Sequence, residues 1–378
     1  MAVPTAPTLS RRTLLGGSLA GVLALTLAAC SGKDDDAGPA ASGASGTGSQ
    51  TVTVVTHDSF QVPEDLVAAF EKDTGYHLQT VASGDSGELV NKLILTKDAP
   101  LGDAVFGVDN TFASRVLDEG VIDTSVSVTL PTGADQYVVG ATPALVPIDF
   151  GEVSVNIDTT YFASKGLTAP ATFEDLVKPD YKDLFVAINP STSSPGLAFL
   201  LATIGHFGTA QSGGFADYWR QLVANGTRID SGWTQAYETD FSGGGNQGAY
   251  PIVVSYSSSP AATVSPDGQS STTASLPATA FRQVEYAGVL TGAANPAGAK
   301  AFIEWMLTKD VQESIPQNMY MYPVSPDASL GDALTRFGTL STTPVSVPAA
   351  DIAANRESWL ATWSEAVGQN YQDRKSVV

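Results

Sequence analysis

The feature that most constrains the fold of this chain is a regular alternation of strand and helix patterns between residues 51 and 108. Thr51 to Thr56 alternates as a strand does, Pro63 to Thr74 has helical periodicity and stops at a glycine, and His77 to Ala82 has a second strand pattern. A helix over Glu88 to Thr96 and an apolar strand over Ala104 to Val108 follow. This βαβαβ order predicts a largely parallel sheet with helices on both faces.

The loops that follow these strands are the places where a site is expected. In open α/β sheets, ligands bind at the carboxyl ends of the parallel strands. The corresponding segments here are His57-Asp58-Ser59, residues 83–87 and Asp109-Asn110.

The remaining sequence predicts a second α/β unit and a return to the first. A long strand over Ala144 to Asn156 crosses to the second unit, and an apolar run over Gln283 to Thr291 comes back. We therefore expect a hinged clamshell with two crossings, built from a first lobe (residues 51–146 plus about 283–378) and a second lobe (residues 147–282). The helices expected at Pro296 to Thr308 and Pro348 to Gly368 could pack on either lobe.

The N-terminus has the pattern of an export signal. Arg11 and Arg12 precede a 17-residue apolar run that ends at Ala29, directly before Cys30, the single cysteine of the chain. The run contains three glycines and is short for a membrane span, so residues 1–29 are interpreted as a signal peptide. The segment Leu27-Ala28-Ala29-Cys30 resembles a lipobox, which makes Cys30 the lipidated residue, and the arginine pair resembles a twin-arginine signal, although Sec signals are also basic.

Composition narrows the classes of partner. Residues 31–50 lack aromatic and large aliphatic side chains, so they are expected to form a flexible tether. Removal of residues 1–29 takes away two arginines and no acids, which leaves 17 basic and 39 acidic side chains, a net charge of −22. Such a surface repels phosphate backbones, so nucleic-acid binding is not expected. The 349 remaining residues are enough for two cores.

Several motifs resemble catalytic or metal sites but lack a necessary part. Gly84-Asp85-Ser86-Gly87 resembles a serine-protease signature, but His57 is too close in sequence and the surrounding pattern is not all-β. The three histidines share no metal-ligand spacing. Tyr320 and Tyr322 alternate, and would face opposite sides of a strand rather than bind iron together. The sequence thus predicts no catalytic residue, metal or cofactor.

Three segments place aromatic side chains among glycines, serines and prolines instead of inside apolar runs. They are Gly232 to Tyr237, Ser255 to Pro260 and Asn318 to Pro323. Core aromatics usually stand in apolar surroundings, whereas flat rings beside hydroxyl groups are typical of sites that stack on a small ligand. Core packing remains the alternative for any single ring. The three loop-like segments together favour a binding role.

These segments belong to a set of seven ordered blocks that resembles a known family. The blocks are Thr56 to Phe60, Gly107 to Asn110, Pro147 to Gly151, Ser193 to Leu197, Gly232-Trp233 with Ala236-Tyr237, Ser255-Tyr256 with Ser259-Pro260, and Ile315-Pro316 with Met321 to Val324. In this order, from about Thr51 to Val367, they look like the thiamine-binding proteins of bacterial ABC importers.

The resemblance implies a type II periplasmic binding protein of class α/β, which closes on thiamine or its phosphates and delivers it to a permease with an ATPase partner. It also implies a monomer anchored by lipid to the outer face of the cell membrane. Trp233, Tyr256 and Tyr320 would frame the rings of the ligand. The polar contacts would come from the remaining site residues, His57, Asp58, Ser59, Asp109, Ser193, Tyr237 and Ser257.

The chain departs from the family pattern at four positions: His57 for tyrosine, Glu152 for an aromatic residue, Ser191 for arginine and Tyr320 for tryptophan. If Glu152 and Ser191 faced the ligand, these changes would favour unphosphorylated thiamine over its phosphates. A receptor of the same fold for another organic cation, ferric iron or an anion is the first alternative. An exported enzyme and an adhesion or scaffold lipoprotein are the others.

Overall fold

The computed structural model describes residues 50–139, 143–245 and 248–368. The expected signal peptide, Cys30 and nearly all of the tether lie outside these residues. All described residues belong to one compact unit, Thr47–Val378. Within the described ranges, no helix has both the length and the apolar character that a membrane crossing requires.

The first part of the chain forms the expected alternation. Gly75 ends the first helix in the left-handed conformation, with φ of 74°, which glycine adopts without a steric penalty. Two strands have the predicted boundaries, and the helix after the second strand begins two residues earlier than expected. The elements are β1 (Thr51–Thr56), α1 (Glu64–Thr74), β2 (His77–Ala82), α2 (Ser86–Leu95) and β3 (Ala104–Asp109).

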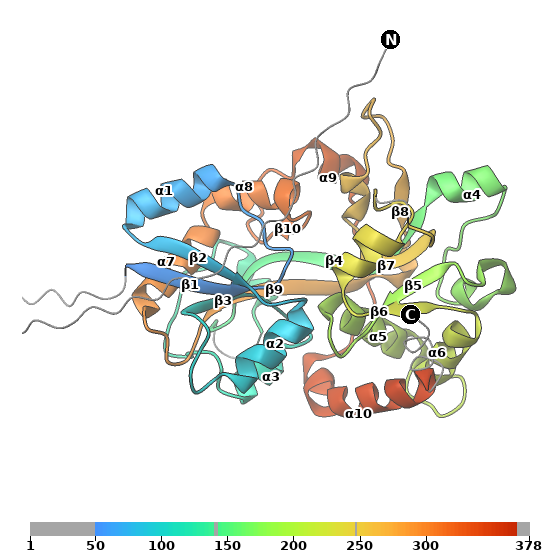
Figure 1. The fold of residues 1–378 in the computed structure, drawn as a ribbon, viewed down its shortest axis with the longest axis horizontal. Coiled ribbons are helices and arrows are strands. Elements are labelled where there is room, and N and C mark those ends of the chain that lie inside the picture. The colour runs from blue at the N-terminus through green and yellow to red at the C-terminus, as the bar shows by residue number, and fades with distance from the viewer. Residues whose placement is uncertain (1–49, 140–142, 246–247, 369–378) are drawn as a thin grey trace, which may run out of the picture. The chain divides into compact units, whose positions relative to one another are not determined.

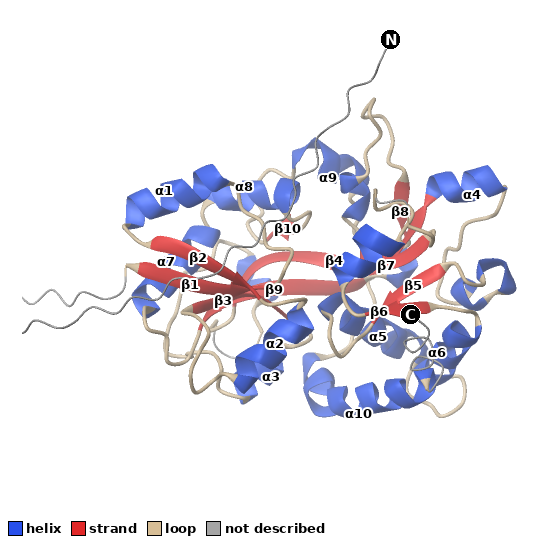
Figure 2. Ribbon diagram, in the orientation of Figure 1, coloured by secondary structure: helices blue, strands red, loops and turns tan. Residues whose placement is uncertain are grey.

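A single sheet of ten strands runs through the molecule (Figures 1 and 2). Its main order is β2-β1-β3-β9-β4-β7-β5-β6, and β8 and β10 pair with β4. The pairs β2-β1, β1-β3, β7-β5 and β5-β6 are parallel, whereas β9 pairs antiparallel with both β3 and β4. The bounds of the later strands are β4 (Val146–Asp158), β5 (Phe185–Ile188), β6 (Arg228–Asp230), β7 (Ile252–Tyr256), β8 (Thr273–Ser275), β9 (Phe281–Val289) and β10 (Tyr322–Pro323).

The long strands β4 and β9 are the two crossings that the sequence predicts. They lie side by side at the centre, between the parallel trio β2-β1-β3 and the parallel trio β7-β5-β6 (Figure 2). Both strands are buried over most of their length because neighbouring strands and helices cover them. The lobe boundaries at residues 146 and 283 stay a prediction, since the described chain clusters as one unit.

Helices cover both faces of the sheet, as the alternation predicts. Val52 and Val54 of β1 pack in one core cluster with α1 and α7, and Val55 packs in a second cluster with α2. This opposite placement follows from the alternation of side chains along a strand. The remaining α-helices are α3 (Ala113–Asp118), α4 (Thr159–Lys165), α5 (Ser194–Phe207), α6 (Phe215–Ala224), α7 (Pro296–Met306), α8 (Lys309–Asn318), α9 (Gly331–Phe337) and α10 (Ala349–Val367).

Two helical features differ from the sequence expectation. The helix expected to end at Thr308 ends at Met306, and a second helix, α8, begins at Lys309. Thr308 between them has an extended backbone, and Pro316 lies inside α8. The segment after Trp233, expected as a loop, forms the π-helical turn η4 (Thr234–Asp240). The C-terminal helix α10 packs mainly on α6 and also touches α3 (Figure 1).

Candidate functional site

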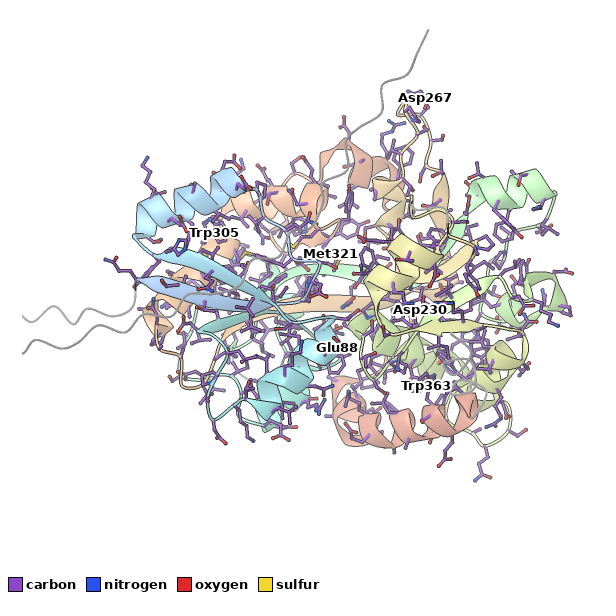
Figure 3. The ribbon with its side chains drawn as sticks, in the orientation of Figure 1. Glu88, Asp230, Asp267, Trp305, Met321 and Trp363 are labelled. Carbon is purple, nitrogen blue, oxygen red and sulfur yellow. The ribbon has the colours of Figure 1, made fainter. Side chains whose placement is uncertain are left out.

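A cavity of about 710 Å³ opens where the loops after several strands converge. Its wall comes from the segments that follow β1, β2, β6 and β7, from the middle of β9 and from the segment after α8. Glu88 of α2 and Met321, more than two hundred residues apart in the sequence, both line it (Figure 3). The cavity therefore lies at the carboxyl ends of parallel strands, as expected, and has the size of a small-molecule site.

One wall of the cavity is aromatic. The rings of Trp233 and Tyr237 stack with centroids 5.0 Å apart and planes at 11°, and Tyr256 stands edge-on to Trp233 at 6.4 Å. The π-helical turn η4 brings Trp233 and Tyr237 onto the same side. Trp233 Nε1 donates a hydrogen bond of 2.9 Å to Ser255 Oγ, which fixes the indole plane. The result is a rigid, flat surface of the kind that stacks on a planar ligand.

A third aromatic residue stands at the edge of the cavity. Tyr320 has a positive φ of 53° and is 37% exposed. A bulky side chain rarely adopts this left-handed conformation, which costs about 1 to 3 kcal/mol and tends to persist at ligand sites. Met319 and Met321 line the cavity on either side of it. Tyr322, by contrast, is buried and stacks on Phe150, so the two tyrosines do face different surroundings.

The loop after β1 supplies polar groups to the cavity. His57, Asp58 and Ser59 all line the cavity. Asp58 Oδ1 accepts a hydrogen bond of 2.8 Å from the N–H of Gly84, which ties this loop to the one after β2. His57 Nδ1 accepts from the N–H of Ser59 at 3.1 Å, so the Nε2 atom of the ring points away from its own loop.

Asp85 is a half-buried carboxyl group of the site that the sequence reasoning did not select. It precedes α2, and its carboxylate accepts hydrogen bonds of 3.0 Å from the N–H groups of Ser194 and Trp233. The N–H of Glu88 also bonds to the carbonyl of Thr192. Burial raises the pKa of Asp85 in spite of these bonds. The loop after β2 therefore touches the start of α5 and the aromatic wall directly.

Glu285 was also missed, because it lies in the middle of the apolar strand β9. It is 5% exposed, lines the cavity and places Oε1 3.5 Å from His57 Nε2. Burial alone would lower the pKa of His57, but the Glu285 carboxylate raises it above its ordinary value. Among the lining residues that the structure describes there is no lysine or arginine, while five are acidic: Asp58, Asp85, Glu88, Glu238 and Glu285.

Three of the expected site residues lie behind the wall. Asp109 is fully buried and accepts hydrogen bonds from Ser194 Oγ and from Gln283 Nε2, the latter at 2.8 Å. Ser193 caps α5 by accepting from the N–H of Gly196. Ser257 is buried, and its N–H donates to the Glu152 carbonyl at 2.8 Å. The other seven expected residues line the cavity: His57, Asp58, Ser59, Trp233, Tyr237, Tyr256 and Tyr320.

Glu152 and Ser191 do not line the cavity either. Glu152 is fully buried and accepts from Arg282 Nη2 at 2.8 Å and from the N–H of Ser341 at 2.6 Å. Ser191 is exposed, and its N–H bonds to Asn189 Oδ1. The argument that these two positions favour unphosphorylated thiamine required them to face the ligand, so it does not hold.

Metal ligands do not converge in the described part of the chain, where no group of three histidine, cysteine, aspartate or glutamate side chains is placed to hold an ion. The combination of flat rings and carboxylates in one cavity lining instead suits a planar organic cation, which gains from both stacking and charge.

Comparisons with known proteins agree with this architecture. Residues 65–341 match the family model described as bacterial extracellular solute-binding protein. The thiamine-binding periplasmic proteins of Salmonella typhimurium and Brucella suis are each 28% identical to the chain, over 84% of its length and 94% and 92% of theirs. A solved structure titled "Periplasmic thiamin binding protein" is 27% identical, with a TM-score of 0.72 over 84% of this chain and 96% of that one.

More distant structures share the fold alone. The ferric binding protein from Campylobacter jejuni is 16% identical, with a TM-score of 0.65 over 83% of this chain and 99% of that one. The expected α/β fold of type II periplasmic binding proteins is confirmed by these neighbours together with the sheet order.

Proposed function

This chain belongs to the family of bacterial extracellular solute-binding proteins, and we propose that the solute it binds is thiamine. In this proposal the protein is an extracytoplasmic receptor that performs no covalent chemistry. It captures thiamine in the cavity and delivers it to the permease of an ABC importer, which an ATPase drives. The proteins named as thiamine-binding among its relatives support this choice of solute.

The observation that carries the proposal is the stacked pair Trp233 and Tyr237 in a cavity whose lining also holds five acidic side chains and, among the described residues, no lysine or arginine. Thiamine contains a thiazolium ring with a permanent positive charge and a neutral aminopyrimidine ring. An aromatic face attracts the first by about 0.5 to 2 kcal/mol, and the carboxylates of Asp58 and Glu285 add charge-assisted contacts. The neutral aminopyrimidine ring can be bound by stacking and hydrogen bonds alone.

We assign individual roles as part of this proposal, and the positions of the side chains in the cavity lining support them. Trp233, Tyr256 and Tyr320 frame the rings, and Asp58 and Tyr237 make polar contacts. His57 and Ser59 complete the polar side. Because Asp109, Ser193 and Ser257 lie behind the wall, we assign them to its support: they hold α5, Gln283 and the segment after β7 in place.

Closure of the two expected lobes is the proposed mechanism. The hydrogen bonds of Asp85 to Ser194 and Trp233 join the residues after β2 to those after β5 and β6. Opening would break these bonds and bend β4 and β9, which cross between residues 51–146 and 147–282. A solute that contacts both sides shifts an existing equilibrium toward the closed form by its better contacts there.

The proposed location follows from the N-terminal sequence. Residues 1–29 would be removed on export, by the twin-arginine or the Sec route, and Cys30 would carry lipid in the outer leaflet of the cell membrane. Residues 31–50 would then hold a monomeric receptor near its permease, which raises the effective concentration of loaded receptor.

Calorimetric titration of residues 31–378 with thiamine tests the proposal. We expect saturable binding at micromolar thiamine or below, together with a change in tryptophan fluorescence. Thiamine phosphates are titrated in parallel, because the described residues of the cavity wall include no lysine or arginine that could pair with a phosphate group. An absence of saturable heat with thiamine would refute the choice of solute.

Competition separates the alternatives. A receptor for another organic cation, for ferric iron or for an anion would bind one of these more tightly than thiamine in the same titration. Mass spectrometry of the incubated ligand would reveal turnover if the protein were an enzyme. An adhesion or scaffold protein would bind none of them.

A further inference from the structure

A row of three buried carboxyl groups crosses the sheet beside the cavity. Glu285 in β9 pairs in register with Asp109 in β3 on one side and with Asp149 in β4 on the other. The exposed fractions of Glu285, Asp109 and Asp149 are 5%, 0% and 0%. Residues directly opposite in an antiparallel pair lie on the same face, where like charges repel. Only Glu285 reaches the cavity.

The row lacks a full countercharge. In the ranges that the structure covers, none of the three carboxyl groups forms an ion pair with lysine or arginine, and the nearest basic atom is His57 Nε2, 3.5 Å from Glu285. This Nε2 atom is buried and lacks a hydrogen-bond partner, as do both carboxylate oxygens of Asp149. Neighbouring carboxylates in a buried site cannot all be ionised, so protons must take the place of the missing cations.

The directions of the pKa shifts of Asp109 and Asp149 agree with this geometry. Burial raises the pKa of Asp109 to about 6, although Ser194 and Thr111 donate to it. Burial and the opposite Glu285 carboxylate raise the pKa of Asp149 well above its ordinary value. Asp109 and Asp149 therefore hold protons more tightly than ordinary carboxyl groups do, and Glu285 is the member of the row that a solute in the cavity can meet.

We infer that Glu285 makes the cavity select a positively charged solute over a neutral one of the same shape, and that entry of the cation displaces protons from the cluster that Asp109, Asp149 and His57 form around Glu285. This inference rests on the proposed function in so far as the cavity is taken to bind a solute. A cation beside Glu285 supplies the charge that protons otherwise supply, so cation and protons compete.

The other groups that face this cluster do not supply the missing charge. Asp58 and Asp85 act on His57 and are themselves acidic. Tyr256 faces Glu285 from β7. Arg356 of α10 lies close enough to act on Asp109, but it packs over the Phe112 ring and pairs with Glu357. Competition with protons is thus expected for the row as a whole.

The first experiment compares thiamine with a neutral analogue in which carbon replaces the charged ring nitrogen. Calorimetry on the purified protein measures both affinities for the wild type and for Glu285→Gln. We expect the substitution to weaken thiamine binding by about tenfold or more, the usual effect of losing a charge-assisted contact, and to change binding of the neutral analogue by less than about threefold. Glu304→Gln, which removes the same charge from the exposed face of α7, is the matched control and should change neither.

The second experiment needs no variant, so a folding defect of Glu285→Gln cannot obscure the answer. Thiamine is titrated into the wild type in two buffers of different ionisation enthalpy, between pH 5 and pH 8. We expect thiamine to release protons and to bind more tightly as the pH rises. The neutral analogue should release fewer protons and show a flatter pH profile.

Different failures have different meanings. If the wild type does not bind thiamine, the proposed function is wrong, and the charge comparison is repeated with choline and its neutral carbon isostere. If the wild type binds a cation but Glu285→Gln keeps the same preference for cation over neutral analogue, the inference about Glu285 is wrong. Proton release that is equal for charged and neutral ligands would overturn the competition between cation and protons.

Discussion

Replacement of Trp233 by alanine tests the aromatic wall in the most specific way. The indole stacks on Tyr237 with centroids 5.0 Å apart and is fixed by its hydrogen bond to Ser255. Alanine removes the face that we expect the thiazolium or pyrimidine ring to cover. Ser255 Oγ keeps its contact with Ser259 Oγ at 2.8 Å, so the substitution leaves that hydroxyl with a partner.

The magnitude follows from the contacts that are lost. Cation–π attraction contributes about 0.5 to 2 kcal/mol and the buried apolar contact about another 1 kcal/mol. The expected loss of about 1.5 to 3 kcal/mol corresponds to an affinity that is lower by a factor of about 12 to 150. Loss of the Trp233–Tyr237 pair acts on the free and the bound protein alike, so it should appear mainly in thermal stability, as about 0.5 to 1.5 kcal/mol.

Calorimetry with thiamine, together with a thermal melt of each variant, separates the two effects. Trp233→Phe keeps a flat face and should lose less affinity than Trp233→Ala. Trp359→Ala, in the half-buried face of α10 and outside the cavity, is the control and should alter the melting temperature but not the affinity. Affinity of Trp233→Ala within threefold of the wild type would refute the assignment of this ring to the binding site.

Three further predictions concern closure, pH and anchoring. Asp85→Asn should speed thiamine release severalfold in stopped-flow measurements. The two carboxylate oxygens of Asp85 accept from the N–H groups of Ser194 and Trp233, whereas an amide has only one oxygen for the two bonds. Unchanged release would argue against a role of Asp85 in closure. Burial raises the pKa of Asp109 to about 6, and burial together with the neighbouring Asp240 raises that of Asp230 to about 7. The folded state therefore holds these protons more tightly than the unfolded state does. The free energy of unfolding should accordingly fall as the pH rises from 5 through 7. A denaturant series that gives greater stability at pH 8 than at pH 5.5 would contradict this. Cys30→Ala should release the protein from the membrane fraction and reduce thiamine uptake, while the affinity of the purified protein stays the same; weakened affinity would contradict the tether.

The sequence predicted the longer strands and the loops at which the cavity lies because both depend on local patterns, whereas the short strands β6, β8 and β10 were not predicted. The boundaries of β1 and β2 follow from side-chain alternation ended by polar or glycine residues, and the parallel order directs attention to the residues after each strand. The π-helical turn after Trp233 was missed, since a short segment rich in hydroxyl groups and aromatic rings lacks helical periodicity.

The direction of individual side chains could not be predicted in this way. Asp58 follows β1 and Asp109 ends β3 of the same sheet, but Asp58 lines the cavity, whereas Asp109 is buried and accepts hydrogen bonds from Ser194 of α5 and Gln283 of β9. Glu285 stands in an apolar run that is typical of a core strand. Its importance arises from the neighbours that β3 and β4 place beside it, which only the tertiary structure brings together.

The most direct test of the central claim is a crystal structure of the protein with thiamine. The account predicts electron density for the ligand in the cavity, with one ring stacked on Trp233 and the charged ring within about 6 Å of an aromatic centroid and close to the Glu285 carboxylate. Thiamine bound elsewhere, or in the cavity with its charged ring turned away from both the aromatic wall and Glu285, would contradict it.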